Sequence, residues 1–146
     1  MSTPDPHNSY DICACAQVRK TARLLTQRYD AALRPAGLKV MQFSILSALA
    51  KFLDISMTTL AERLVLDRTG LTRNLKPLER DGLIAIRPGK DSRQRIIHLT
   101  DLGREVLKQA VPLWQDVQHQ IIDEIGETQI DILHSGLANL NHAAQI

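Results

Sequence analysis

The sequence has few aromatic residues, few cysteines and no long apolar runs. Aromatic side chains make up 3% of the 146 residues, which argues against a protein that stacks single-stranded bases on its rings. No run of 18 uncharged apolar residues occurs, so no transmembrane helix is expected. The first residues show no basic segment followed by an apolar one, so no signal peptide is expected. These absences favour a cytoplasmic protein with reduced thiols.

Motifs for catalysis and cofactor binding are also absent from the sequence. It contains no G-x-S-x-G nucleophile elbow and no G-x-x-x-x-G-K-[ST] phosphate loop. The histidines that follow the N-terminal segment form no HxxxH or HExxH pair, and two thiols are too few for a closed zinc site. We therefore expect no enzyme, no cofactor and no metal centre.

Charge is distributed unevenly along the chain, although the net charge is only +2. Counting Lys and Arg against Asp and Glu gives +3 for residues 1–54, +4 for residues 55–100 and −5 for residues 101–146. A basic middle followed by an acidic end indicates a polyanionic partner for the middle segment, with an ordinary solvated surface as the alternative.

Apolar residues recur mainly at helical spacing, so we expect a mainly helical chain of one domain. Residues 1–9 hold two prolines and are expected to form a flexible tail. Thr58, Asp67 and Thr100 are positioned to cap helices. The expected helices span residues 10–33, 39–53, 59–65, 68–80, 101–125 and a final segment that begins at residue 128.

Residues 83–99 differ from the rest because they predict a β-hairpin. Leu83–Arg87 alternates as a strand should, Pro88–Ser92 has the composition of a turn, and Arg95–Leu99 completes a second strand. The hairpin carries four basic residues, which core packing does not explain: Arg87, Lys90, Arg93 and Arg95.

The order of short helix, tight turn, helix and basic hairpin is typical of a winged helix-turn-helix. In that unit the second helix enters the DNA major groove, and a basic hairpin can reach the minor groove. A helical hairpin with solvated charges is the alternative. The polar residues that residues 68–80 would present to base edges and phosphates are Arg68, Thr69, Thr72, Arg73, Asn74 and Lys76.

Several segments, in order along the chain, resemble the MarR family of winged-helix regulators. The similar blocks are GLKVMQFSIL at 37–46, LAERL at 60–64, DRTGLTR at 67–73, LERDGLI at 78–84, DSRQR at 91–95 and LTDLG at 99–103. The resemblance covers nearly the whole chain. It implies a winged helix-turn-helix reader at 55–100 within one domain at 10–146.

The resemblance also implies a homodimer on a pseudo-palindromic double-stranded DNA. Residues 10–36 and 101–146 would supply the dimerisation helices, which agrees with the wide apolar stripes at both ends of the chain. By the same analogy Arg93 enters the minor groove, and Asp91 braces the wing by pairing with a nearby arginine. A plain turn role is the alternative for Asp91. Arg73 would contact phosphate, with an ion pair to Glu79 or Asp67 as its alternative.

Regulation by a ligand is a further implication of the family. The family analogy favours a repressor that a small aromatic or phenolic effector relieves, bound between the dimerisation helices and the reader. An adaptor that binds proteins and has lost DNA binding is a rival hypothesis, but an adaptor has no reason to keep a basic wing.

Cys13 and Cys15 raise the question of a redox signal. The segment around Tyr29 is similar to the organic-hydroperoxide-sensing branch of the family, in which a cysteine near this position senses peroxide and tyrosines bond its thiolate. This resemblance makes Cys15, Cys13 and Tyr29 redox candidates. The alternatives are small hydrophobes buried at a helix interface, or a metal or metalloid site.

Overall fold

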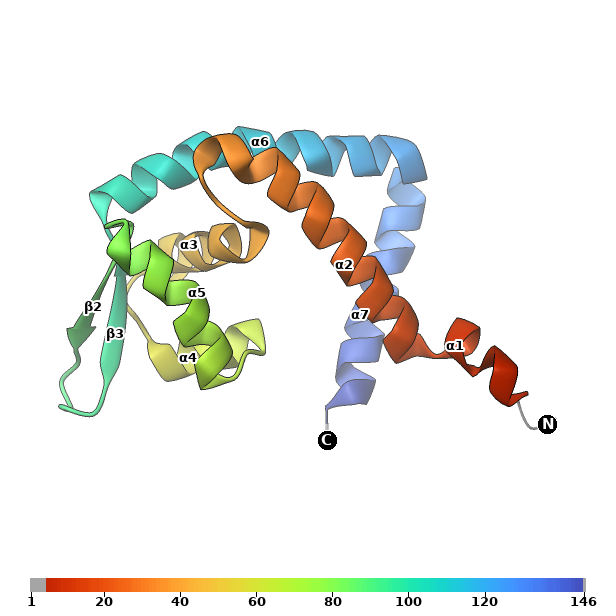
Figure 1. The fold of residues 1–146 in the computed structure, drawn as a ribbon, viewed down its shortest axis with the longest axis horizontal. Coiled ribbons are helices and arrows are strands. Elements are labelled where there is room, and N and C mark those ends of the chain that lie inside the picture. The colour runs from red at the N-terminus through yellow and green to blue at the C-terminus, as the bar shows by residue number, and fades with distance from the viewer. Residues whose placement is uncertain (1–4, 146) are drawn as a thin grey trace.

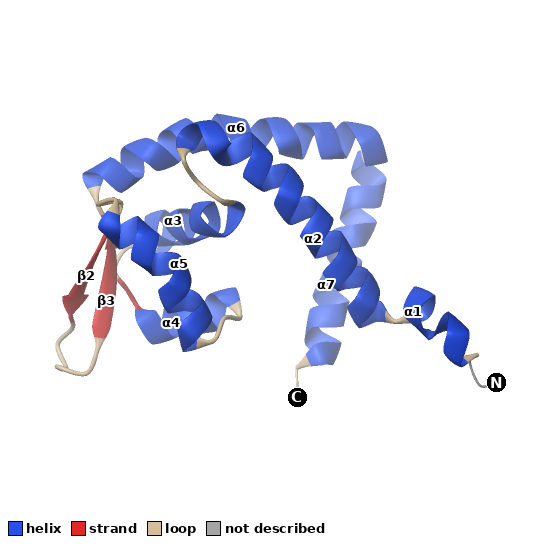
Figure 2. Ribbon diagram, viewed as in Figure 1, coloured by secondary structure: helices blue, strands red, loops and turns tan. Residues whose placement is uncertain are grey.

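The computed structural model describes residues 5–145 and is mainly helical, with one small sheet (Figures 1 and 2). The expected fold class is confirmed. The longer helices are α2 (Ala14–Leu33), α3 (Val40–Phe52), α4 (Met57–Leu64), α5 (Arg68–Arg80), α6 (Asp101–Ile125) and α7 (Glu127–Ala144). The strands are β1 (Ile55–Ser56), β2 (Ile84–Pro88) and β3 (Arg95–Leu99).

The sheet has the strand order β1-β3-β2 and is antiparallel throughout. Ile97 at its centre lies opposite Ile86 on one side and Ile55 on the other, and Ile97 is fully buried. The hairpin expected at 83–99 is confirmed. Strand β1 was not expected, because two residues are too short to show an alternating pattern between the helices expected at 39–53 and 59–65.

The N-terminal segment is more regular than the sequence indicates. Within the expected flexible tail, Pro6–Asn8 form a turn of 3-10 helix, capped by the Asp5 side chain, and α1 follows at Ser9–Ile12. The helix expected from residue 10 to residue 33 is broken at Cys13, whose backbone is extended. Gln17 explains the break, because its side-chain amide donates to the carbonyls of Tyr10 and Asp11 at the end of α1. Residues 1–4 lie outside the described part of the chain.

The core joins the helix-turn-helix, the sheet and the first half of α6. Leu46 and Leu49 of α3, Leu60 of α4 and Leu71 of α5 are fully buried in it. The Phe43 and Trp114 rings stack with their centroids 5.7 Å apart, which ties α3 to α6. Within residues 5–145 no buried side-chain nitrogen or oxygen lacks a hydrogen-bond partner.

The junction between the wing and α6 is unusually close. The Thr100 backbone N–H donates to the Leu83 carbonyl (3.1 Å), and its hydroxyl donates to the Gly82 carbonyl (2.6 Å). The same hydroxyl accepts from the Gly103 N–H (3.0 Å), so the expected Thr100 cap is confirmed. A Cβ atom at Gly103 would lie 2.0 Å from the Leu83 carbonyl oxygen. Only glycine fits at this crossing.

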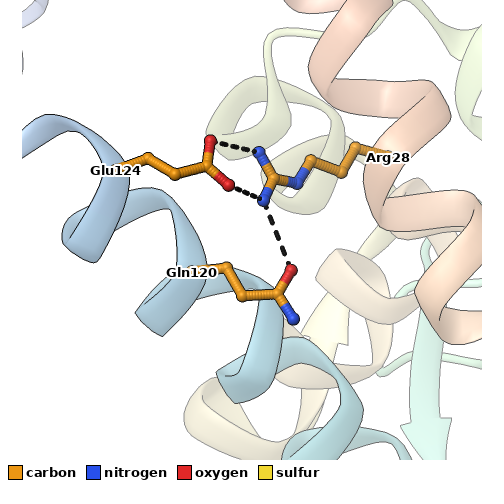
Figure 3. A network of polar contacts seen from close by, with 3 residues as sticks. All are labelled: Arg28, Gln120 and Glu124. Atoms are coloured by element: carbon orange, nitrogen blue, oxygen red, sulfur yellow. Dashed lines mark hydrogen bonds and ion pairs between the residues drawn. The ribbon is translucent and has the colours of Figure 1, made fainter.

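A polar strap joins α2 to the far half of α6 (Figure 3). The Arg28 guanidinium donates to both carboxylate oxygens of Glu124, at 3.2 and 2.8 Å, and to Gln120 Oε1 at 3.3 Å. This hydrogen bonding raises the pKa of Arg28 and lowers the pKa of Glu124 from their ordinary values. Next to it, the Tyr29 hydroxyl donates to Gln118, and burial raises the pKa of Tyr29. The strap therefore links the two helices at the surface.

Helix α7 adds little to the interior of the single chain. None of its described residues, Glu127–Ala144, is buried. Figure 1 shows α6 leading away from the helix-turn-helix and α7 turning back from the far end of α6. The apolar stripes of α2 and α7 are left open to solvent, including Val18, Leu24, Leu25, Ile132, Leu133, Leu137 and Leu140.

Among residues 5–145, no helix is both long enough and apolar enough to cross a bilayer.

Candidate nucleic-acid interface

Helix α5 separates an apolar face from a basic face, as its sequence predicts. Asp67 caps its N-terminus by accepting from the Gly70 N–H (2.6 Å), so the expected cap is confirmed. Helix α4 is capped by Ser56 rather than by the expected Thr58, because α4 begins two residues earlier than expected.

Leucines of α5 are buried against the core, which leaves the opposite face exposed. Five predicted DNA contacts line one shallow depression there: Arg68, Thr69, Thr72, Arg73 and Lys76.

Thr72 and Asn74 of α5 donate hydrogen bonds to carbonyls of their own helix, which limits the polar groups they can offer to DNA bases. The Thr72 hydroxyl donates to the Arg68 carbonyl (2.8 Å), which leaves its methyl group as the distinctive contact. The Asn74 side-chain amide donates to the Gly70 carbonyl (2.9 Å), and the residue is half-buried. Asn74 therefore does not lie with Arg68 and Arg73 on the exposed basic face, because its side chain bonds to its own helix.

The wing presents its basic residues to solvent. Arg87 lies opposite Ile96 in the ladder, and Arg87, Lys90, Arg93 and Arg95 are all exposed. Asp91 forms no ion pair within residues 5–145, so the expected pairing with an arginine is corrected. Its carboxylate instead accepts from the Arg93 N–H (3.1 Å), as aspartate commonly does in turns. Asp91 thus shapes the turn that carries Arg93.

The basic residues of α5 and the wing that are predicted to contact DNA form no ion pair among residues 5–145. The ion pairs among residues 5–145 join Arg28 to Glu124 and Arg80 to Asp81, and the His98 ring forms a hydrogen bond with the Asp54 carboxylate. None of them involves a basic residue predicted to contact DNA. The alternative interpretation of Arg73, an ion pair with Glu79 or Asp67, is not what the structure shows. An anion approaching this face meets cations that have no competing partner.

A cleft of about 710 Å³ lies between the wing and the helix-turn-helix. Arg68 from α5 and both Arg93 and Arg95 from the wing line it. In Figure 1 the wing tip, α4 and the N-terminal end of α5 lie toward the same side of the molecule. Val65, in the turn between α4 and α5, also lines the cleft and was missed by the sequence analysis. A turn of three residues is too short to show the periodic pattern by which Val65 could have been identified.

Cys13 and Cys15 lie near the N-terminus, well before the residues of α5 and the wing in the sequence. Cys13 and Cys15 are both exposed, so in the single chain they are not buried hydrophobes. Tyr29 is 14 residues from Cys15 in the same helix, or about 21 Å at the helical rise per residue. Tyr29 of the same chain therefore cannot bond the Cys15 thiolate. Within residues 5–145 no three His, Cys, Asp or Glu side chains gather as a metal site would require.

Fold and site together define the class of the protein: a winged helix-turn-helix with an uncompensated basic reading face is a DNA-binding architecture. Comparison with known proteins identifies the family. The MarR family profile matches residues 36–94, which includes the helix-turn-helix and most of the wing. The chain belongs to the MarR family of DNA-binding transcriptional regulators, whose members are not enzymes.

Solved structures extend the similarity over most of the chain. The DNA complex of the transcriptional regulator MosR from M. tuberculosis is 40% identical, with a TM-score of 0.79 over 92% of this chain and 99% of that one. Sco5413, a MarR family regulator from Streptomyces coelicolor, is 25% identical, with a TM-score of 0.80 over 92% of this chain and 94% of that one.

A curated relative shows a shorter match. The uncharacterized HTH-type transcriptional regulator YwoH from Bacillus subtilis (strain 168) is 30% identical over 84 residues. That match covers 58% of this chain and 61% of YwoH.

Proposed function

We propose that this protein is a homodimeric regulator that binds a pseudo-palindromic double-stranded DNA. Helix α5 would enter the major groove and the wing would reach the adjacent minor groove. The uncompensated basic face carries the proposal: Arg68, Arg73 and Lys76 of α5 are exposed beside the arginines of the wing, without ion pairs among residues 5–145. The MosR complex supports it, because that relative was crystallised with DNA.

The exposed apolar stripes support the homodimer. Helix α7 buries none of its described residues in one chain, yet Leu133 and Leu137 recur at helical spacing along it. A second copy that packs its α2 and α7 against these stripes would remove them from water. The segment 101–146, with its charge of −5, supplies α6 and α7 rather than the reading face. Two reading helices could then meet major grooves about 34 Å apart.

Oligomeric state has a direct test. Light scattering after size exclusion should give the mass of two 16.3 kDa chains. Replacing both Leu133 and Leu137 by Asp should give the mass of one chain, because two carboxylates would have to be buried in the interface. A native protein that runs as one chain would refute the dimer.

DNA binding is tested by fluorescence anisotropy with a duplex selected from genomic fragments. If the dimer neutralises about ten phosphates, the log–log salt slope should be roughly −9. We expect Arg93→Ala to lower the affinity more than about tenfold, because a wing arginine sits in deep negative potential. Arg104→Ala, at an exposed position of α6, is the matched control and should have no such effect. A flat salt response would contradict the proposal, and full affinity in Arg93→Ala would favour the protein-binding adaptor.

We also propose that the protein acts as a repressor that a small aromatic or phenolic effector relieves. An effector between the dimerisation helices and the reader would change the separation of the two α5 helices. A coupling of about 1–3 kcal/mol would change DNA affinity about 5–150-fold. Transcription in vitro from the selected operator, with and without the protein, tests the repressor role; activation would contradict it.

A thiol sensor on the same fold is the second candidate, favoured by the exposure of both cysteines. Since Tyr29 of the same chain is out of reach, a Tyr29 hydroxyl that bonds to Cys15 would have to come from the partner. The test compares release of DNA by cumene hydroperoxide between the native protein and Cys15→Ser. Equal release in both would eliminate the sensor.

A further inference from the structure

Val65 occupies a backbone position that usually belongs to glycine. It ends α4 with a left-handed backbone, φ 52° and ψ 44°. Its N–H donates to the Glu62 carbonyl (3.2 Å), and the N–H of the next residue, Leu66, donates to the Ala61 carbonyl (2.9 Å), which closes the last turn of the helix. Glycine is common at such a helix end, because a side chain, and above all a β-branched one, crowds the left-handed backbone. Valine therefore carries a conformational cost that glycine would avoid.

The interior of the protein does not account for the Val65 side chain. This side chain is 90% exposed, whereas the neighbouring Leu66 is half-buried and packs against the core. Leu66 therefore supplies the apolar contact that holds the turn between α4 and α5 in place. Residues with a strained backbone cluster at functional sites, where the strain is part of the function. A strained, exposed and apolar residue in this turn indicates a contact with a partner molecule.

The surroundings of Val65 favour DNA as that partner. Val65 lines the cleft together with Arg68, the first residue of α5, which is exposed and forms no ion pair among residues 5–145. The first residues of a recognition helix face base edges in the major groove, and Val65 precedes α5 by only three positions. The apolar group that base edges present in that groove is the 5-methyl group of thymine. The Val65 side chain matches this group in chemistry and in size.

We propose that Val65 is a specificity-determining residue, which contacts the 5-methyl group of one thymine in each half of the operator. The inference rests on the proposed DNA binding and adds to it a residue outside the reading helix. Apolar contact requires only that the methyl groups approach within about 4 Å, so a short, fixed turn can provide it. Contacts of Arg68 with phosphate or guanine supply affinity and their own specificity. Val65 adds a preference for thymine over cytosine at one base pair of each half-site.

The test removes one methyl group at a time from the DNA. Each thymine of the selected operator is replaced by deoxyuridine at the equivalent positions of both half-sites, and the affinity of each duplex is measured by fluorescence anisotropy. With the native protein, at least one such replacement should weaken binding about fourfold per half-site, or about fifteenfold for the pair, because one buried methyl group is lost from each contact. Native affinity for every deoxyuridine duplex would overturn the inference.

Val65→Gly assigns the sensitive thymine to this residue. Glycine removes the side chain and adopts the left-handed backbone without strain, so the turn should keep its conformation. The variant should bind the thymine and deoxyuridine duplexes equally at the sensitive position, because no side chain remains to contact the methyl group. Leu53→Gly is the matched control, since Leu53 is also apolar, 62% exposed and positive in φ (55°), but lies outside the cleft. This control should keep the native preference for thymine.

The ratio of the two affinities decides the outcome, because it cancels any general loss of binding in the variant. If Val65→Gly keeps the native ratio at every thymine, the inference is overturned. Another side chain then reads the methyl groups or, where all duplexes bind more weakly by one factor, Val65 contacts the DNA backbone instead. A failure of the proposed function is distinct from these results, because the native protein would then bind none of the duplexes.

Discussion

Replacing Gly103 by alanine tests the closest contact in the fold. The new Cβ would lie 2.0 Å from the Leu83 carbonyl oxygen and 2.7 Å from Leu99 Cδ1, so α6 must move away from the wing by about 1 Å to restore a 3.0 Å contact. That movement strains the hydrogen bonds from Thr100 to the Leu83 and Gly82 carbonyls.

The magnitude follows from three contributions. Overpacking costs about 1–3 kcal/mol, and two lost hydrogen bonds cost about 1 kcal/mol each. The higher helix propensity of alanine returns about 1 kcal/mol. We therefore expect Gly103→Ala to lower the free energy of unfolding by about 2–4 kcal/mol, a large share of the typical total.

The assay is urea unfolding followed by far-UV circular dichroism, at one chain concentration because the stability of the proposed dimer would depend on concentration. Lys108→Ala, at an exposed position of the same helix, is the control and should change the free energy of unfolding by less than about 0.5 kcal/mol. Exposed glycines in helices gain stability when changed to alanine. A stability in Gly103→Ala equal to or above that of the native protein would therefore refute the close crossing.

Three further predictions concern the reading helix, the strap and the cap. Arg68→Ala should reduce the preference for the operator over a mismatched duplex about tenfold, whereas Lys76→Ala should weaken both duplexes equally; competition binding separates the two outcomes. Because Arg28 lowers the pKa of Glu124, their pairing stabilises the fold above the ordinary pKa of 4.5 and is lost as the pH falls through the lowered value. Glu124→Gln should therefore flatten the loss of stability on acidification, as urea unfolding at several pH values would show; an unchanged pH profile would contradict this. Thr100→Val should lower the free energy of unfolding by about 1–2 kcal/mol in the same assay, and no loss would exclude its capping role.

Regular elements could be predicted from the sequence because their information is local. Asp67 and Thr100 were identified as caps, and α5 was placed at its observed bounds, since a capping residue and the leucine spacing lie within one short segment. The β-hairpin was found for the same reason. Strand β1 was missed, because its pairing with Ile96 and Ile97 joins residues about 40 positions apart, which no local pattern records.

The sequence predicts which residues share the basic face of the candidate site, but not the hydrogen bonds that their side chains form. Helical spacing alone places Arg68, Thr69, Thr72, Arg73 and Lys76 together. It does not show that the Asn74 amide bonds to the Gly70 carbonyl, or that Asp91 accepts from the backbone of Arg93. The role of Val65 in lining the cleft could not be predicted from the sequence, because a β-branched residue disfavours the left-handed backbone that it adopts.

The exposed apolar residues of α7 have a consequence for the concentration at which the protein is stable in a cell. In the proposed homodimer a second copy covers the apolar surface of a newly made chain, so dilute chains would stay exposed to proteases and to aggregation. Pairing would then act as a threshold: below it the chain is removed, and above it stable regulator accumulates. A promoter controlled by such a protein would respond to its abundance more steeply than in proportion.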